Sequence, residues 1–276
     1  MKKYFFPLLG LLCLSAPAFA QTELEDENDF QTRLSIGIDK KITKGFHFTA
    51  EEEFRFENGI SAIDRFQTSF GLSYKVNSFL KAGLSYTLLN PYKESTSAFT
   101  NPRHRFSFDL TGSYKTALWT FSLKERFQLT HRSGSFNEYQ SNANAMVLKS
   151  RLTAKYRGFG MVKPYAFAEL RNTLNAPSIK ATYDSSTGTY LTSSGSEEGD
   201  AGWFISGWDN MYVNRIRGAL GCDIDLSKQH GLSVFFLTDY YTDKSVDANK
   251  AGTKLKSYTV QHGLNLTLGL GYTYSF

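Results

Sequence analysis

Hydrophobic and polar residues alternate over long stretches of this chain, and the last stretch shows the pattern most clearly. From Tyr258 to Phe276 every even position except His262 is apolar, whereas no odd position carries an apolar side chain. A period of two is typical of a β-strand with one apolar and one polar face. An ordinary globular strand has about 5–6 residues, and a strand that crosses a membrane needs about 9–11. The length therefore favours a membrane barrel over a soluble sandwich.

The same alternation recurs upstream and predicts ten further strands. Their approximate limits are residues 30–38, 46–56, 65–74, 80–88, 106–114, 119–129, 146–156, 164–170, 216–224 and 232–236. The phase of the stretch that follows Pro164 is ambiguous. Short and long polar links alternate between the strands, as in bacterial outer-membrane barrels, whose periplasmic turns are short and whose outer loops are long. The predicted fold class is all-β, a transmembrane antiparallel up-and-down β-barrel of about 10–12 strands.

The number of strands and the longest link need a closer look. Eleven strands are counted, but bacterial single-chain barrels use even numbers, so that both termini reach the periplasm. We therefore expect twelve, with one strand overlooked within residues 202–213, or ten if one stretch is divided wrongly. The longest link, residues 172–207, is rich in Ser, Thr and Gly, and we expect a small hairpin at residues 184–188.

The composition agrees with a barrel and excludes a helical membrane protein. Phe and Tyr number 23 and 16, yet the mean hydropathy is −0.34. Beyond the first twenty residues, no apolar run approaches the length of a spanning helix. In a membrane barrel only every second residue faces lipid, which explains how an aromatic-rich chain can have a polar average.

The first twenty residues have the order of a secretory signal peptide. Lys2 and Lys3 precede an apolar stretch, and Ala18-Phe19-Ala20 is a small-x-small cleavage site. We expect residues 1–20 to be cleaved and residues 21–276 to form a single outer-membrane barrel domain. Loss of the two lysines lowers the net charge from +5 to +3, which is too mild to indicate a nucleic-acid partner.

The C-terminal residues add an independent signal. Tyr272, Tyr274 and Phe276 occupy the last outward positions of the final strand. This arrangement resembles the terminal signature by which outer-membrane barrels reach their assembly machinery, and aromatic rings suit the membrane interface. We therefore predict localisation in the bacterial outer membrane. The predicted partners are outer-membrane lipids, lipopolysaccharide and the barrel-assembly machinery.

Several short segments, taken in order, show a likeness to a known family. They are Glu51-Glu52-Glu53-Phe54-Arg55-Phe56, Asp64-Arg65-Phe66, Pro102-Arg103-His104-Arg105-Phe106, Lys124-Glu125-Arg126-Phe127, Lys149-Ser150-Arg151-Leu152, Asn214-Arg215-Ile216-Arg217, Lys228-Gln229-His230-Gly231-Leu232 and Gly269-Leu270-Gly271-Tyr272. Over nearly the whole mature chain, the sequence resembles the outer-membrane family called domain of unknown function 2490. The resemblance implies a Gram-negative outer-membrane barrel, of a Bacteroidota type, and implies no activity.

Charged side chains crowd the polar phase of the strands, which should face the lumen. The candidates for lumen-lining charge are Arg103, Arg105, Lys124, Arg126, Lys149, Arg151, Arg215, Arg217, Glu51, Glu53 and Asp109. One interpretation is a basic pore wall that favours anions, since Arg binds carboxylate or phosphate bidentately. The other is a lumen filled by Arg–carboxylate ladders that join neighbouring strands. We favour the second interpretation.

Two acidic residues, Glu52 and Glu125, fall on the lipid-facing phase of their strands, near the middle. A charge at that position is costly unless it is paired, turned inward or close to the interface. Either these residues contact a protein or a lipid headgroup at the wall, or a β-bulge flips the local register.

The sequence contains no catalytic motif. The outward phase of His104 and His262 leaves one alternative, a lipid-modifying acyl hydrolase in which His activates Ser. The five His are scattered without metal-site spacing, and no Gly-rich phosphate loop occurs. We therefore predict a porin-like, non-enzymatic barrel, either a narrow pore or a plugged binding or structural barrel. No catalytic residue, metal or cofactor is expected.

Overall fold

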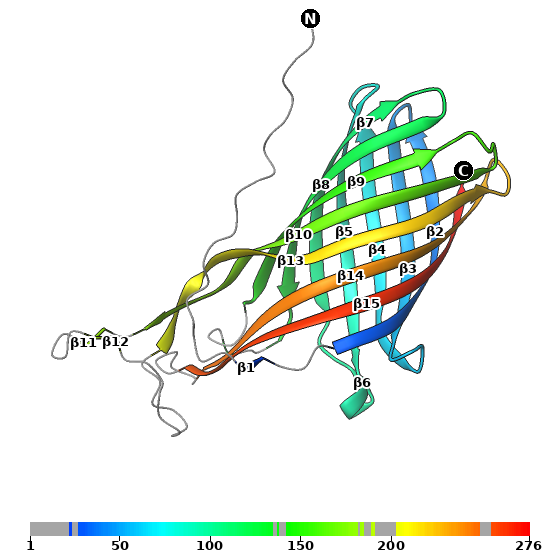
Figure 1. Cartoon of the computed structure of the whole chain (residues 1–276). Helices are drawn as coiled ribbons and strands as arrows, with labels where there is room; N and C mark the ends of the chain where they lie inside the picture. Colours follow the sequence, from blue (N-terminus) through cyan, green and yellow to red (C-terminus); the bar gives the residue numbers. More distant parts are fainter. Residues whose placement is uncertain are drawn as a thin grey trace, which may run out of the picture.

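The chain folds into a β-barrel (Figure 1). The computed structural model describes residues 22–23, 27–134, 137, 142–181, 183–184, 189–190, 203–248 and 255–276. Eleven strands form the barrel within this part of the chain. They are β2 (Glu27–Thr43), β3 (Phe46–Glu57), β4 (Ala62–Lys75), β5 (Leu80–Lys93), β7 (Arg103–Lys115), β8 (Trp119–Arg132), β9 (Asn144–Tyr156), β10 (Val162–Ala181), β13 (Trp203–Asp225), β14 (His230–Ala248) and β15 (Leu255–Ser275).

The remaining elements are short. They are β1 (Thr22–Glu23), the 3₁₀ turn η1 (Glu94–Thr96), β6 (Ala98–Phe99), β11 (Tyr183–Asp184) and β12 (Thr189–Tyr190). The strands β11 and β12 pair antiparallel, which confirms the small hairpin expected about residues 184–188. Among the described residues, no helix is long and apolar enough to cross a membrane.

The barrel closes through a parallel pair. Each barrel strand is antiparallel to its neighbour in the chain, whereas β15 pairs with β2 in parallel, from Gly263 opposite Glu27 to Ser275 opposite Asp39. An odd number of alternating strands leaves the first and last pointing the same way. The eleven strands confirm the predicted range of about 10–12 and equal the number counted from the alternation, whereas the even-number expectation of twelve, or ten, is wrong. The strand sought within residues 202–213 is the first part of β13.

The two ends of the barrel differ in their connections, as the sequence predicted. Short links of residues 44–45, 76–79, 116–118, 157–161 and 226–229 lie at the end that holds Phe276. We call this the turn end; in Figure 1 it carries the mark of the C-terminus. Most links at the opposite end, the loop end, are longer, and β2 begins there. The backbone N–H of Asn58 in the link between β3 and β4 donates to Asp29 near the start of β2.

At the loop end β10, β13, β14 and β15 continue beyond the other strands (Figure 1). The prediction of a loop over residues 172–207 is therefore wrong, because β10 extends to Ala181 and pairs there with Trp203 of β13. Register shifts follow Arg171 along this extension. The extension has a small core of its own, where Ile205 and Val246 pack against partly buried apolar neighbours.

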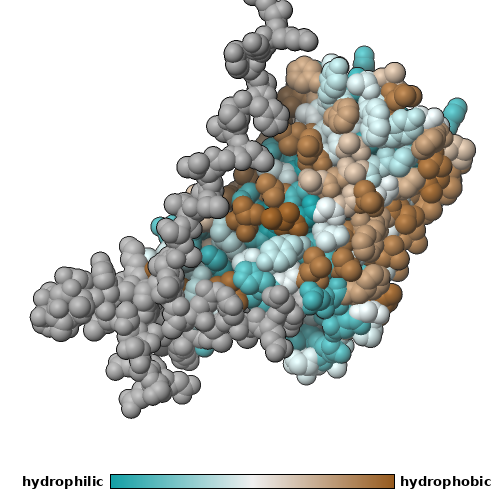
Figure 2. All heavy atoms as spheres, in the orientation of Figure 1, coloured by the Kyte–Doolittle hydropathy of each residue, from teal (hydrophilic) through white to brown (hydrophobic). Residues whose placement is uncertain are grey.

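The wall of the barrel has its apolar face on the outside. Leu84 and Leu220 are 62% and 69% exposed, and many large apolar residues share this outer face. On the inner face, Gln67, Asp239 and Thr267 are polar yet buried. Figure 2 shows hydrophobic residues spread over the flank of the barrel. The period of two along each strand explains both faces, since successive side chains point to opposite sides of the sheet.

Candidate functional site

Two neighbouring rows of charged side chains cross the inner face of the barrel between β7 and β14. Residues of one row lie directly opposite each other on adjacent strands. The alternating row reads Lys124, Arg151, Glu169, Arg217 and Asp239 from β8 to β14. The basic row reads Asp109, Arg126, Lys149, Arg171 and Arg215 from β7 to β13.

Carboxylates and guanidiniums form a continuous ladder along the alternating row. Glu169 accepts from Arg151 Nη2 at 2.6 Å and from Arg217 Nη1 at 3.2 Å. Arg217 Nη2 also donates to Asp239 at 2.8 Å. The side chains of Glu169 and Asp239 are only 3% and 1% exposed, so the carboxylates of these ion pairs are shielded from water. This is the geometry that the ladder interpretation of the lumen expects.

The basic row has carboxylate partners only toward its ends. Asp109 binds Arg126 with two bonds, Nε to Oδ1 at 2.5 Å and Nη2 to Oδ2 at 2.6 Å. At the other end, Arg215 donates to Asp239 at 3.0 Å. Between them, neither Lys149 nor Arg171 has a carboxylate within ion-pair distance in the described part of the chain. Four cations thus follow each other on adjacent strands.

A small cavity adjoins the two rows. Its volume is about 40 Å³, and its lining consists of Lys124, Arg126, Lys149, Arg151 and Glu169. A cavity needs roughly 10–15 Å³ on this measure to hold one water molecule. The cavity therefore has room for a few waters or one small ion, in a lining of four cations and one carboxylate.

Arg105, another predicted lumen residue, lies in a basic environment. Its Nε donates to Thr130 Oγ1 at 3.1 Å. The charged groups that act on it most strongly are all arginines from other strands: Arg55, Arg65, Arg171 and Arg126. Positive charge from several sides of the barrel therefore meets in this part of the lumen.

The other predicted lumen residues lie outside the two rows. Arg103 stands opposite Arg132, toward the loop end. Glu53 accepts from Arg55 Nε at 2.5 Å and from Gln67 Nε2 at 2.9 Å. Glu51 is exposed on the same face of β3.

The C-terminal aromatic residues lie at the turn end, beside the seam between β15 and β2. Tyr272 OH is 2.6 Å from His230 Nδ1, and the rings of Tyr274 and Phe276 stack with centroids 5.5 Å apart. Phe276 N donates to Asp39 O at 3.0 Å, and Lys40 Nζ lies 4.8 Å from the Phe276 ring centroid.

The alternation also places Asp239 on the polar phase, but sequence reasoning missed two members of the rows, Glu169 and Arg171. Both lie on β10, where Tyr165 and Phe167 share the inner face with them and obscure the apolar–polar phase. The Arg151 guanidinium lies 4.1 Å from the Phe167 ring centroid, which shows why an aromatic residue is stable among the charges. The spacing of Tyr165, Phe167, Glu169 and Arg171 at every second position is the signal that could have identified them.

Glu52 and Glu125 lie on the outer face of their strands, as the alternation predicts. The register is continuous through Glu52 in both of its strand pairs, and likewise through Glu125. The β-bulge suggested for them is therefore wrong. Ser150 Oγ on the adjacent strand donates to Glu125 Oε2 at 2.6 Å, which gives this carboxylate a partner on the outer wall.

The outward histidines contact Tyr and Thr hydroxyls and not the serine that the acyl-hydrolase alternative requires. His104 Nδ1 is 2.8 Å from Tyr86 OH, and His262 Nδ1 is 2.9 Å from Thr242 Oγ1. No serine hydroxyl bonds to a histidine ring among the described residues. Within the same residues, no group of three or more His, Cys, Asp or Glu could hold a metal ion.

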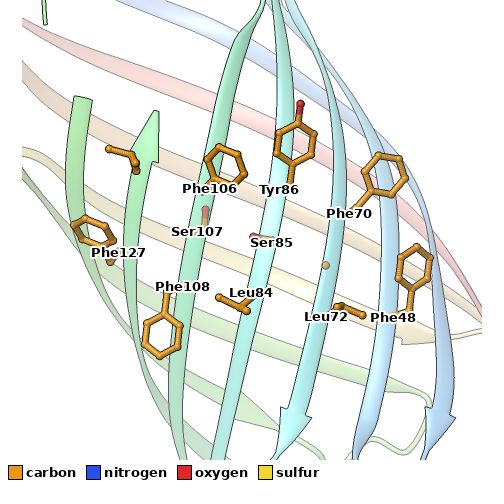
Figure 3. Close-up of a pocket in the computed structure, with 12 residues that line it drawn as sticks. Phe48, Phe70, Leu72, Leu84, Ser85, Tyr86, Phe106, Ser107, Phe108 and Phe127 are labelled. Carbon is orange, nitrogen blue, oxygen red and sulfur yellow. The ribbon is translucent and has the colours of Figure 1, made fainter. Parts of the chain in front are cut away.

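A shallow apolar groove crosses the outer wall (Figure 3). Its volume is about 540 Å³. One side carries Phe70, Tyr86 and Phe106, and the other carries Leu72, Leu84 and Phe108. Gly71 and Ser85 lie between the two sides, and because both positions belong to the inner phase, the floor of the groove there is backbone. This surface suits hydrocarbon.

Comparison with known proteins agrees with the family likeness noted in the sequence. Residues 30–185, more than half of the chain, match the family model described as protein of unknown function (DUF2490). No curated protein matches the chain. The match confirms the resemblance, and its description names no activity. The chain therefore belongs to the DUF2490 family of proteins of unknown function.

Proposed function

We propose that this protein is a non-enzymatic barrel of the Gram-negative outer membrane, exported with the aid of a cleaved signal peptide. The exposed apolar flank supports this location, because monomeric soluble proteins rarely expose apolar patches larger than a few hundred Å². The alternation of short and long links supports it as well, since short turns face the periplasm in bacterial barrels.

Within the membrane, the barrel provides a constricted passage that favours small anions. The observation that carries this proposal is the charge of the two inner rows. Together they contain seven cations and three carboxylates, so positive charge remains after every ion pair is formed. Rings of Arg and Lys are how anion pores select their ions. The buried ladder narrows the passage without removing this excess.

Conductance of the purified, refolded protein in a planar bilayer tests the proposal. Under a potassium chloride gradient we expect small, steady currents and a reversal potential with the sign of chloride preference. Arg105→Gln should move the ratio of chloride to potassium permeability toward one, because it removes a lumen charge without leaving a carboxylate unpaired. Lys228→Gln, which changes an exposed residue in a turn, should leave the ratio unchanged.

Two results would contradict the proposal. A correctly folded sample that passes no current would show that the lumen is closed. A reversal potential with the sign of potassium preference would show that the inner carboxylates, rather than the excess of cations, determine selectivity.

A further inference from the structure

The basic row violates a rule of sheet electrostatics. Like charges directly opposite each other on neighbouring strands are destabilising. Arg126, Lys149, Arg171 and Arg215 nevertheless follow each other on β8, β9, β10 and β13 without an intervening carboxylate. In the alternating row, two residues away along each strand, Glu169 separates Arg151 from Arg217 and Asp239 follows Arg217, so only Lys124 and Arg151 are like charges opposite each other.

The repulsion is greatest in the middle of the basic row. Arg126 and Arg215 each contact a carboxylate, Asp109 and Asp239. Arg171 has a neutral partner, the side-chain amide of Asn214. With the amide oriented so that its oxygen faces Arg171, this oxygen accepts from Arg171 Nη1 at 2.6 Å. Lys149 has neither a hydrogen bond nor an ion pair among the described residues. Among the described residues, its ammonium is therefore the donor of the basic row that has neither an anionic nor a neutral partner.

The cavity provides the space for such an acceptor. Lys149 lines it together with Lys124, Arg126 and Arg151. Glu169 is the carboxylate of the lining, and Arg151 and Arg217 already occupy it. A volume of about 40 Å³ fits an inorganic ion and excludes a nucleotide or a sugar phosphate. Arginine and lysine donors together match the oxygens of a tetrahedral or planar oxyanion.

We propose that this cavity binds a small inorganic oxyanion of the phosphate type, with Lys149 as its principal donor. The anion separates the cations of the basic row as Glu169 separates Arg151 from Arg217 in the alternating row. The inference deepens the proposed anion passage and rests on it, because it names one stopping place and the class of ion that stops there.

Binding of inorganic phosphate to the detergent-solubilised full-length protein tests the site. Calorimetric titration should show saturable phosphate binding to the wild type, and Lys149→Met should weaken it about tenfold or more. The urea concentration at the midpoint of unfolding gives a second measurement. Here the same substitution that weakens phosphate binding should stabilise the protein. Lys149→Met should unfold at a higher urea concentration than the wild type in phosphate-free buffer, because one of the repelling charges is gone.

A matched control separates the site from general salt effects. Phosphate is excluded from protein surfaces and stabilises many folds without binding. Lys155→Met changes a lysine of the same strand whose partner is Asp223, and it should keep the affinity of the wild type for phosphate. Equal phosphate affinity of the wild type and Lys149→Met, or no saturable binding to either, would overturn the site.

The two proposals can fail separately. Anion-selective current without phosphate binding would leave the passage and remove the site. Phosphate binding that depends on Lys149 in a barrel without current would leave the site and remove the passage.

Discussion

Asp239 shows what one residue can contribute to this lumen. Its carboxylate is almost fully buried and accepts from Arg215 Nη1 at 3.0 Å and from Arg217 Nη2 at 2.8 Å. Removing one partner of a buried ion pair leaves an uncompensated charge, which costs about 3–5 kcal/mol. Asp239→Asn should therefore lower the free energy of unfolding by about this amount, as measured by urea unfolding in lipid vesicles.

Asp225→Asn is the matched control. Asp225 likewise pairs with a cation of a neighbouring strand, Lys163, but its side chain is 51% exposed. Exposed ion pairs contribute about 0–1 kcal/mol, so this variant should stay close to the wild type. Similar losses for the two variants would show that burial does not govern the strength of the ladder.

The residues of the lumen could be predicted better than their partners. Alternation alone places Asp109, Arg126 and Lys149 on the polar phase, because a period of two assigns a face to every position. It does not place Arg126 opposite Lys149, since cross-strand register depends on where each turn begins. The lack of a carboxylate between the four cations of the basic row therefore became visible only when the strands were paired.

At the scale of elements, the strand cores followed from the sequence and the strand ends did not. The extension of β10 begins where the register shifts after Arg171, and further shifts occur between Thr173 and Ile179. Each shift adds an unpaired residue and moves later side chains to the other face. The period of two is lost there although the backbone remains extended and paired, so the extension has the sequence character of a loop.

The two ends of the barrel make a prediction about orientation. Short turns face the periplasm in bacterial barrels, so the turn end should lie inside and the loop end outside. With Cys222 replaced by Ala, a cysteine introduced by Ser61→Cys should react with a membrane-impermeant maleimide on intact cells. A cysteine introduced by Lys228→Cys should react only after the outer membrane is permeabilised.

Both positions are exposed in links between strands, so differences in labelling report on location. Labelling of Lys228→Cys on intact cells, with protection of Ser61→Cys, would reverse the orientation. The start of β2 lies beside the link that contains Ser61. Labelling of Ser61→Cys therefore also shows on which side of the membrane the first barrel strand begins.

For the whole molecule, the decisive feature is the parallel seam. The alternation predicts eleven strands. We nevertheless expected twelve, or ten, because bacterial single-chain barrels use even numbers. Nothing in the alternation distinguishes a parallel closing pair from an antiparallel one, since both bury and expose the same faces. The odd strand count was the signal that could have predicted the seam, because eleven alternating strands leave the first and last parallel.

A disulfide across the seam tests the closure. Leu34 and Leu270 lie opposite each other, on strands whose spacing of about 4.8 Å suits a disulfide. In a Cys222→Ala background, Leu34→Cys with Leu270→Cys should form an intramolecular disulfide under mild oxidation, and this changes migration on a denaturing gel.

The control pair combines Leu34→Cys with Leu264→Cys. The second cysteine then lies six residues away along β15, roughly 20 Å from the first at about 3.3 Å per residue. Cross-linking of the control pair but not of the first pair would disprove the parallel register.

The seam also has a consequence for the order of folding. It joins parts of the chain that are far apart, as the bond from Leu264 N to the side chain of Asn28 shows across 236 positions. The other barrel pairings join strands that follow each other in the chain, so their loops close sooner. We therefore expect the seam to be the last pairing to form, and until then β2 and β15 are unpaired edges that can pair with another chain. A successful fold depends on keeping those edges apart from other molecules for as long as the barrel stays open.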